Sequence, residues 1–125
     1  MHEFELQLTS HFAAAMVLPD YHGPCANLHG HTYAVKVVVS TKTLDENGMI
    51  IDHVILKNHL DQVLQKLDHT YLNDLDWFAD VAPTTENIAK IIFEQMNKLL
   101  KQYENIDVKQ VKIAENQNVS ISYGR

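Results

Sequence analysis

The stretch FELQLTSHFAAAM at Phe4–Met16 decides the fold, because its hydrophobic pattern has a period of two. Its even positions are mostly apolar and include Phe12 and Met16, whereas its early odd positions are polar, as at Glu5 and Gln7. This alternation is typical of a β-strand with one buried face. We therefore predict a strand over this stretch, with one side against a hydrophobic core.

The rest of the chain predicts a second strand, two helices and a further pair of strands. Turn residues and β-branched side chains mark the later strands, at Thr32–Ser40, Val108–Ala114 and Val119–Tyr123. Apolar residues spaced three or four positions apart mark the helices. These are Leu56, Leu60, Val63, Leu64 and Leu67 in the first helix, and Ile88, Ile92, Met96, Leu99 and Tyr103 in the second. The order ββααββ predicts a single α+β domain over residues 1–125, with both helices on one face of an antiparallel four-stranded sheet.

Local signals place the ends of these elements. Asp52 is suited to cap the first helix, and Thr84 or Thr85 the second. The segment ENQN at residues 115–118 predicts a hairpin turn between the last two strands. Four strands leave two open sheet edges, which favour pairing with other subunits.

Composition narrows the class of protein. The 125 residues are 46% hydrophobic and 21% charged, which suits one domain with one core. The net charge is −6 and no cluster of Lys or Arg is present, which argues against nucleic-acid binding. No apolar run reaches membrane-spanning length, and the N-terminus does not resemble a signal peptide. Together with the single cysteine, these features predict a cytoplasmic protein with no membrane partner.

Two histidines are candidates for a metal site. His29 and His31 flank Gly30 at the entry to the second strand, and residues two apart on a strand point to the same side. Both imidazoles can therefore reach one ion. Catalytic zinc usually has three protein ligands, so this pair is incomplete, and a chance pair on a half-exposed strand is the alternative interpretation.

Three residues are candidates for the third ligand. His11 lies at an odd, polar position of the first strand, and His22 lies in a Pro- and Gly-containing loop from which it could bend inward. Met16 ends the inward-facing stripe. Its thioether is a soft donor that suits Cu(I) better than Zn²⁺, and its ordinary role is an apolar plug.

Five segments, in order along nearly the whole chain, share a pattern with one enzyme family. They are SHFAAAMVL at residues 10–18 followed by Cys25, LHGHTY at residues 28–33, GMIID at residues 48–52, LDHTYLN at residues 67–73, and PTTEN at residues 83–87. Together they resemble the 6-pyruvoyltetrahydropterin synthase / 6-carboxytetrahydropterin synthase family. The resemblance implies a tunnelling fold (T-fold), in which ββααββ subunits join edge to edge into a β-barrel, commonly a hexamer made of two trimers. It also implies active sites between subunits.

The resemblance implies a zinc site made by three histidines, as the cofactor site of the enzyme. His29 and His31 match two of them, but Met16 stands where the family has the first. His22 is the candidate substitute for the missing ligand.

The resemblance also assigns catalytic and binding roles. Cys25 matches the general base, and Asp68 and His69 match an acid–base pair. Without the resemblance, Cys25 would be a small buried hydrophobe, and the Asp–His pair would be an ordinary helix end. The pterin-binding matches are Glu115, Thr84, Thr85 and Glu86. The residues at 84–86 also suit an ordinary helix N-terminus, and the two roles are compatible.

These matches predict a zinc-dependent carbon–oxygen lyase that acts on 7,8-dihydroneopterin triphosphate. In bacteria the expected product is 6-carboxy-5,6,7,8-tetrahydropterin, a precursor of queuosine and other 7-deazapurines. Two alternatives stay open. One is the 6-pyruvoyl product, and the other is a pterin-binding member with weak or no zinc and little lyase activity, because Met16 replaces a histidine.

Overall fold

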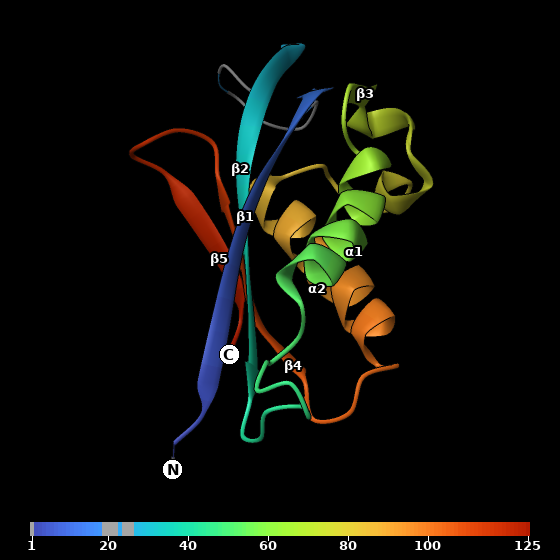
Figure 1. Cartoon of the computed structure of the whole chain (residues 1–125). Helices are drawn as coiled ribbons and strands as arrows, with labels where there is room; N and C mark the ends of the chain where they lie inside the picture. Colours follow the sequence, from blue (N-terminus) through green and yellow to red (C-terminus); the bar gives the residue numbers. More distant parts are fainter. Residues whose placement is uncertain (1, 19–22, 24–26) are drawn as a thin grey trace.

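A computed structural model shows two helices packed on one face of a mixed sheet (Figure 1). The structure describes residues 2–18, 23 and 27–125. Within these residues the sheet has five strands in the order β3-β1-β2-β4-β5. In chain order the elements are β1 (Phe4–Met16), β2 (His29–Thr41), α1 (His53–Gln65), β3 (Thr70–Tyr71), two short 3₁₀ turns η2 (Leu72–Asp74) and η3 (Asp76–Phe78), α2 (Thr85–Leu100), β4 (Asp107–Ala114) and β5 (Ser120–Gly124).

The first strand confirms the period-two prediction from Leu6 to Met16, whereas Phe4 at its start is exposed. It pairs with β2 in one continuous antiparallel ladder, from Phe4 opposite Thr41 to Met16 opposite His29. Its even positions turn toward the helices, and Phe12 and Met16 are buried there. Strand β2 begins earlier than predicted, at His29, because the ladder with β1 continues through Met16.

The predicted four-stranded antiparallel sheet is corrected by a fifth strand. Strand β3 is only two residues long and runs parallel to β1, with Thr70 opposite Ala14 and Tyr71 opposite Ala15. A two-residue strand is too short to produce a period in the sequence. It forms because side chains on either side of it bind the main chain of β1, as described below.

Both predicted helices form, and side chains cap them. Asp52 Oδ1 accepts a hydrogen bond from the Val54 N–H at 2.9 Å. Thr84, rather than Thr85, caps α2, and its Oγ1 accepts from the Asn87 N–H at 3.2 Å. The apolar stripes of both helices pack against Val35, Val37 and their neighbours on the sheet to form the core. Leu99 is only partly buried at the end of α2, where Leu100 fills the core position instead.

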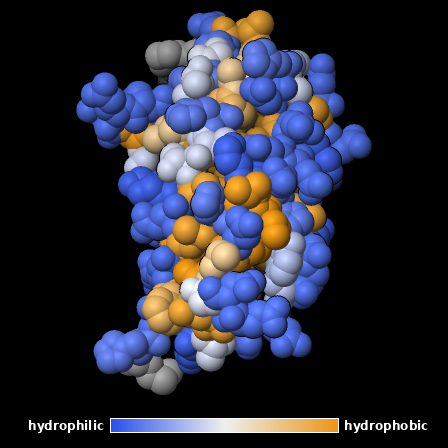
Figure 2. All heavy atoms as spheres, in the orientation of Figure 1, coloured by the Kyte–Doolittle hydropathy of each residue, from blue (hydrophilic) through white to orange (hydrophobic). Residues whose placement is uncertain are grey.

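The outer edge of β1 is open along most of its length. Among the described residues, β3 pairs only with Ala14 and Ala15 on that edge, and β5 forms the other edge of the sheet. Figure 2 shows hydrophobic residues gathered between β1 and the neighbouring part of α1. Phe4, Val54 and Ile55 are exposed large hydrophobics of these two elements. Within the described residues, no helix is long and apolar enough to cross a membrane.

Candidate functional site

A pocket of about 540 Å³ lies where β1, β2 and β3 meet, at the end of the sheet where β3 is labelled in Figure 1. Small residues leave the space, and two of the predicted site histidines are among the residues that line it. The lining residues are Ala13, Ala14, Ala15, Gly30, His31, Thr32, His69, Thr70 and Tyr71. The structure therefore brings a predicted metal ligand, His31, and a predicted acid–base residue, His69, to the same pocket.

The two histidines of β2 lie on one face of the strand. Their ring centroids are 4.9 Å apart, and the rings meet edge to face. Nδ1 of His29 is 2.8 Å from the carbonyl oxygen of Asn27. A carbonyl oxygen only accepts, so this Nδ1 carries the proton and Nε2 carries the free lone pair. His29 Nε2 is buried and has no hydrogen-bond partner among the described residues, which is the state expected of a metal-ligating nitrogen.

Met16 lies beside these histidines at the position predicted for the third ligand. It is directly opposite His29 in the β1–β2 ladder, and only 3% of it is exposed. Its Sδ accepts a hydrogen bond from the Tyr33 hydroxyl at 3.0 Å. The ring of Tyr33 is in turn 5.4 Å from that of His31, so all four side chains form one connected group.

The described residues do not supply a three-ligand zinc site. They contain no group of three His, Cys, Asp or Glu side chains placed to hold one metal ion. His11 is exposed on the other face of β1 and does not reach the pair. Two predicted residues, Cys25 and the candidate substitute ligand His22, lie outside the residues that the structure describes. The donor set here is two imidazoles and a thioether, which does not fit the usual zinc site.

Asp68 and His69 form the predicted pair, and both are bonded to β1. Asp68 Oδ1 accepts from the Ala13 N–H at 2.8 Å, and Oδ2 lies 2.9 Å from His69 Nδ1. The His69 N–H donates to the Ala13 carbonyl at 2.5 Å. Hydrogen bonds from the Ala13 N–H and then from the His69 ring hold the pKa of Asp68 below its usual value. The His69 side chain is 82% exposed, and its Nδ1 is the ring nitrogen that faces Asp68.

Asn73 adds a further attachment of this segment to the chain beside β1, a role that was not predicted from the sequence. Its Oδ1 accepts from the Val17 N–H at 3.0 Å, and its Nδ2 donates to the Val17 carbonyl at 2.9 Å. The amide therefore binds Val17 as a neighbouring strand would. Asp68, β3 and Asn73 together bind the end of β1, and this clamp holds His69 in a left-handed conformation with φ of 57°. The L-D-H-x-x-L-N motif was the signal in the sequence that Asn73 belongs with Asp68 and His69. The motif could not show that Asn73 binds Val17, because Val17 is distant in the sequence.

Glu115 and Thr85 form a second group of predicted residues. Thr85 is buried at the start of α2, and its Oγ1 donates a short hydrogen bond to Glu115 Oε1. Glu115 follows β4 on the helix side of the sheet, where its N–H donates to the Val119 carbonyl and closes the predicted hairpin. Thr84 is occupied as the helix cap, and Glu86 is exposed. None of these residues lines the pocket that contains His31 and His69.

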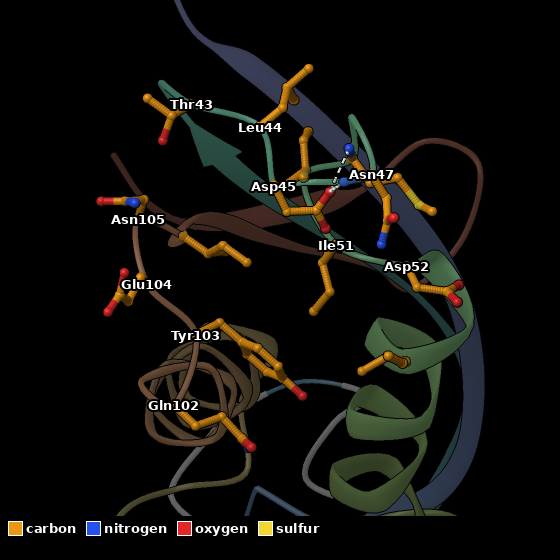
Figure 3. Close-up of a pocket in the computed structure, with 14 residues that line it drawn as sticks. Thr43, Leu44, Asp45, Asn47, Ile51, Asp52, Gln102, Tyr103, Glu104 and Asn105 are labelled. Carbon is orange, nitrogen blue, oxygen red and sulfur yellow. Dashed lines mark hydrogen bonds between the residues drawn. The ribbon is translucent and has the colours of Figure 1, made fainter.

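A larger cleft, of about 630 Å³, lies at the opposite end of the sheet between the β2–α1 and α2–β4 connections (Figure 3). Asp45, Asp52, Tyr103 and Glu104 are among its lining residues. Asp45 Oδ1 accepts from N–H groups of its own loop, those of Asn47 and Met49. None of the predicted site residues lines this cleft, so pocket size alone does not locate the candidate site.

Comparison with known proteins identifies the class to which this fold and site belong. Residues 5–125 match the family described as 6-pyruvoyl tetrahydropterin synthase, and the chain belongs to that family of pterin-forming lyases. A solved 6-pyruvoyl tetrahydropterin synthase of Caenorhabditis elegans has the same T-fold, with a TM-score of 0.87 and 27% identity over 100% of this chain and 97% of that chain.

Curated relatives carry two different names. The 6-carboxy-5,6,7,8-tetrahydropterin synthase of Bacillus subtilis is 36% identical over 109 residues, which cover 83% of this chain and 73% of that protein. The enzyme of the same name from Synechocystis is 40% identical over 70% of each chain. The human 6-pyruvoyl tetrahydrobiopterin synthase is 39% identical over 62% of this chain and 57% of its own length.

Proposed function

We propose that this protein is a lyase that converts 7,8-dihydroneopterin triphosphate into 6-carboxy-5,6,7,8-tetrahydropterin, on the cytoplasmic route to queuosine and other 7-deazapurines. The names of the Bacillus and Synechocystis relatives support this product. The observation that carries the proposal is that His69, paired with Asp68, lines the same pocket as His31.

The proposed chemistry rests on proton transfer by the chain's own side chains. Loss of triphosphate breaks a carbon–oxygen bond, and a proton must leave the neighbouring carbon. The 6-carboxy product also requires one water to be taken up and one carbon–carbon bond of the side chain to break, so that the two outer carbons leave as acetaldehyde. Asp68 accepts the hydrogen bond from His69 Nδ1, which fixes the tautomer and leaves Nε2 to take up and return a proton. Cys25 is proposed as the general base, as the family resemblance predicts.

Glu115 is proposed to bind the pterin ring. A carboxylate can accept two hydrogen bonds from adjacent N–H groups of such a ring. Thr85 donates to one oxygen and orients the carboxylate, and it leaves acceptor capacity for a ligand. Because Glu115 does not share the pocket of His31 and His69 within one chain, we propose that complete sites form between subunits of a homohexamer. The open edge of β1 supports edge-to-edge pairing.

We propose that the protein binds zinc only weakly. His29 and His31 are the two proposed ligands, and Met16 is a poor third donor for zinc. This same observation favours a second candidate function, a family member that binds a pterin but has little lyase activity. The human relative's name keeps the 6-pyruvoyl product as an alternative.

One experiment separates these functions. Purified, untagged protein is incubated with dihydroneopterin triphosphate with and without added zinc, and the products are identified by mass spectrometry. The 6-carboxy product supports the proposal, and the 6-pyruvoyl product would redirect it. Pterin binding without turnover at any zinc concentration would establish the binding-only function instead. Elemental analysis of the same sample is expected to give less than one zinc per chain.

A further inference from the structure

We propose that Met16, His29 and His31 form a binding site for a soft monovalent metal ion, Cu(I), in place of the zinc site of the family. The proposal concerns the metal alone, so it stands or falls independently of lyase activity.

The register of the β1–β2 ladder places the three donors together. Met16 is directly opposite His29, and opposite residues of an antiparallel pair point to the same face. His31 lies two residues further along that face, with its ring centroid 4.9 Å from that of His29. Two imidazoles that bind one ion through nitrogens about 2.0–2.1 Å away have a similar separation of roughly 5 Å.

The hydrogen bond of His29 Nδ1 leaves the other ring nitrogen available to a metal. Its Nδ1 is held by the Asn27 carbonyl, so the lone pair is on Nε2. That Nε2 is buried without a hydrogen-bond partner among the residues described. A buried acceptor without a partner is costly, and a metal ion would satisfy it. Phe12, stacked on Tyr33 at 4.8 Å, helps to hold the aromatic side of the site in place.

The third donor selects the ion. A thioether is soft and uncharged, which suits Cu(I) and is unfavourable for Zn²⁺. Tyr33 donates to Met16 Sδ, which fixes the buried side chain on the side of the histidines and leaves sulfur a second lone pair. All three donors are neutral, so a bound Cu(I) leaves one uncompensated charge where Zn²⁺ would leave two. Burial penalises the doubly charged ion more strongly.

The test is a metal titration of the full chain in a Cys25→Ser background, which removes the competing thiol. Cu(I) affinity is measured by competition with bicinchoninate under anaerobic conditions, and Zn²⁺ affinity by competition with a chromophoric chelator. We expect one Cu(I) per chain and at least a tenfold loss of Cu(I) affinity in Met16→Leu, which keeps a buried apolar side chain. Met16→His should raise Zn²⁺ affinity at least tenfold and reverse the preference. Unchanged Cu(I) affinity in Met16→Leu would overturn the proposal.

A second measurement needs no change at Met16. The methionine methyl groups are labelled with ¹³C, and Ag(I), a soft monovalent ion without redox chemistry, is added to the same background. We expect the Met16 methyl signal to shift with one equivalent of Ag(I), whereas those of exposed Met49 and buried Met96 stay in place. An unmoved Met16 signal at saturation, or equal shifts at Met16 and Met49, would refute the site even if Met16→Leu failed to fold.

Discussion

The two ends of the sheet each carry a hollow, and the hollows are built differently. At the β3 end, Asp68 binds the main chain of Ala13 in β1 and Asn73 binds that of Val17 just after β1, and these partners lie 55 and 56 residues away in the sequence. At the other end, the larger cleft is lined by side chains such as Asp45, whose carboxylate accepts from the Asn47 and Met49 N–H groups of its own loop. In the larger cleft the long-range bond joins two side chains, those of Tyr103 and His59, and does not bind a distant strand. The comparison teaches that the size of a hollow does not locate the candidate site, and that the two ends differ in whether side chains bind the main chain of a distant segment.

The substitution with the largest expected effect tests whether proton transfer takes place at the β3 end of the sheet. His69→Gln removes the titrating ring, and loss of a general acid–base group costs roughly 10²–10⁴-fold in rate. We expect kcat for dihydroneopterin triphosphate to fall by that factor. The matched control is Tyr103→Phe in the opposite cleft, with kcat changed less than about twofold. Equal losses in the two variants would contradict the division between the two ends.

Next in size is the effect of Glu115 on pterin affinity. Glu115→Ala removes a charged acceptor, and hydrogen bonds to charged groups contribute about 1.5–3 kcal/mol, or roughly 10–150-fold in affinity. Titration of pterin followed by fluorescence should show this loss. Glu104→Ala, a carboxylate of the opposite cleft, should bind pterin as the unmodified chain does. Pterin affinity retained in Glu115→Ala would remove this residue from the site.

Asn73 should matter more for stability than Asn47, an amide of the opposite cleft. Asn73→Ala leaves the Val17 N–H and carbonyl without their partner, which costs about 1–3 kcal/mol in the free energy of unfolding. The control Asn47→Ala removes an exposed side chain and should change it by less than about 0.5 kcal/mol. Urea denaturation at one fixed protein concentration measures both. Equal values would show that the clamp on Val17 contributes nothing to stability.

The smallest expected effect is a dependence on pH. The pKa of Asp68 is lower in the folded chain, because the Ala13 N–H and the His69 ring favour its ionised form. Its contribution to stability is therefore present above the unfolded pKa, near 3.9, and is lost as the pH falls through the folded value. The difference in denaturation midpoint between the unmodified chain and Asp68→Asn should shrink below about pH 4. A difference that stays constant from pH 7 to pH 3 would exclude this role.

Local signals account for the parts of the fold that could be predicted from the sequence. The alternation in β1 and the Asp52 cap depend on residues close together in the chain, and both are confirmed. The apolar stripes are confirmed within the two helices, although Leu67 and Tyr103 lie beyond the helix ends. Strand β3 could not be predicted, because its pairing depends on Ala14 and Ala15, far away in the sequence. The choice between Thr84 and Thr85 as cap also needed the structure, since both residue types suit the position.

The candidate site likewise has features that the sequence predicts and features that only the structure shows. Parity along β1 and β2 placed Met16, His29 and His31 on one face, as observed. It could not show that Tyr33 bonds to the Met16 sulfur, because parity gives a direction and not a partner. Nor could it show that Glu115 and Thr85 lie apart from the His31 pocket, since that depends on where α2 packs.

The left-handed backbone of His69 affects which residues position 69 tolerates. A residue with a side chain loses roughly 1–2 kcal/mol at a positive φ, and glycine does not. His69→Gly should therefore unfold at a higher denaturant concentration than His69→Ala, and neither variant keeps the imidazole. The backbone conformation taken alone therefore favours glycine at this position. The histidine found there works against that backbone preference, and its ring supplies the hydrogen bond to Asp68 that glycine would lack.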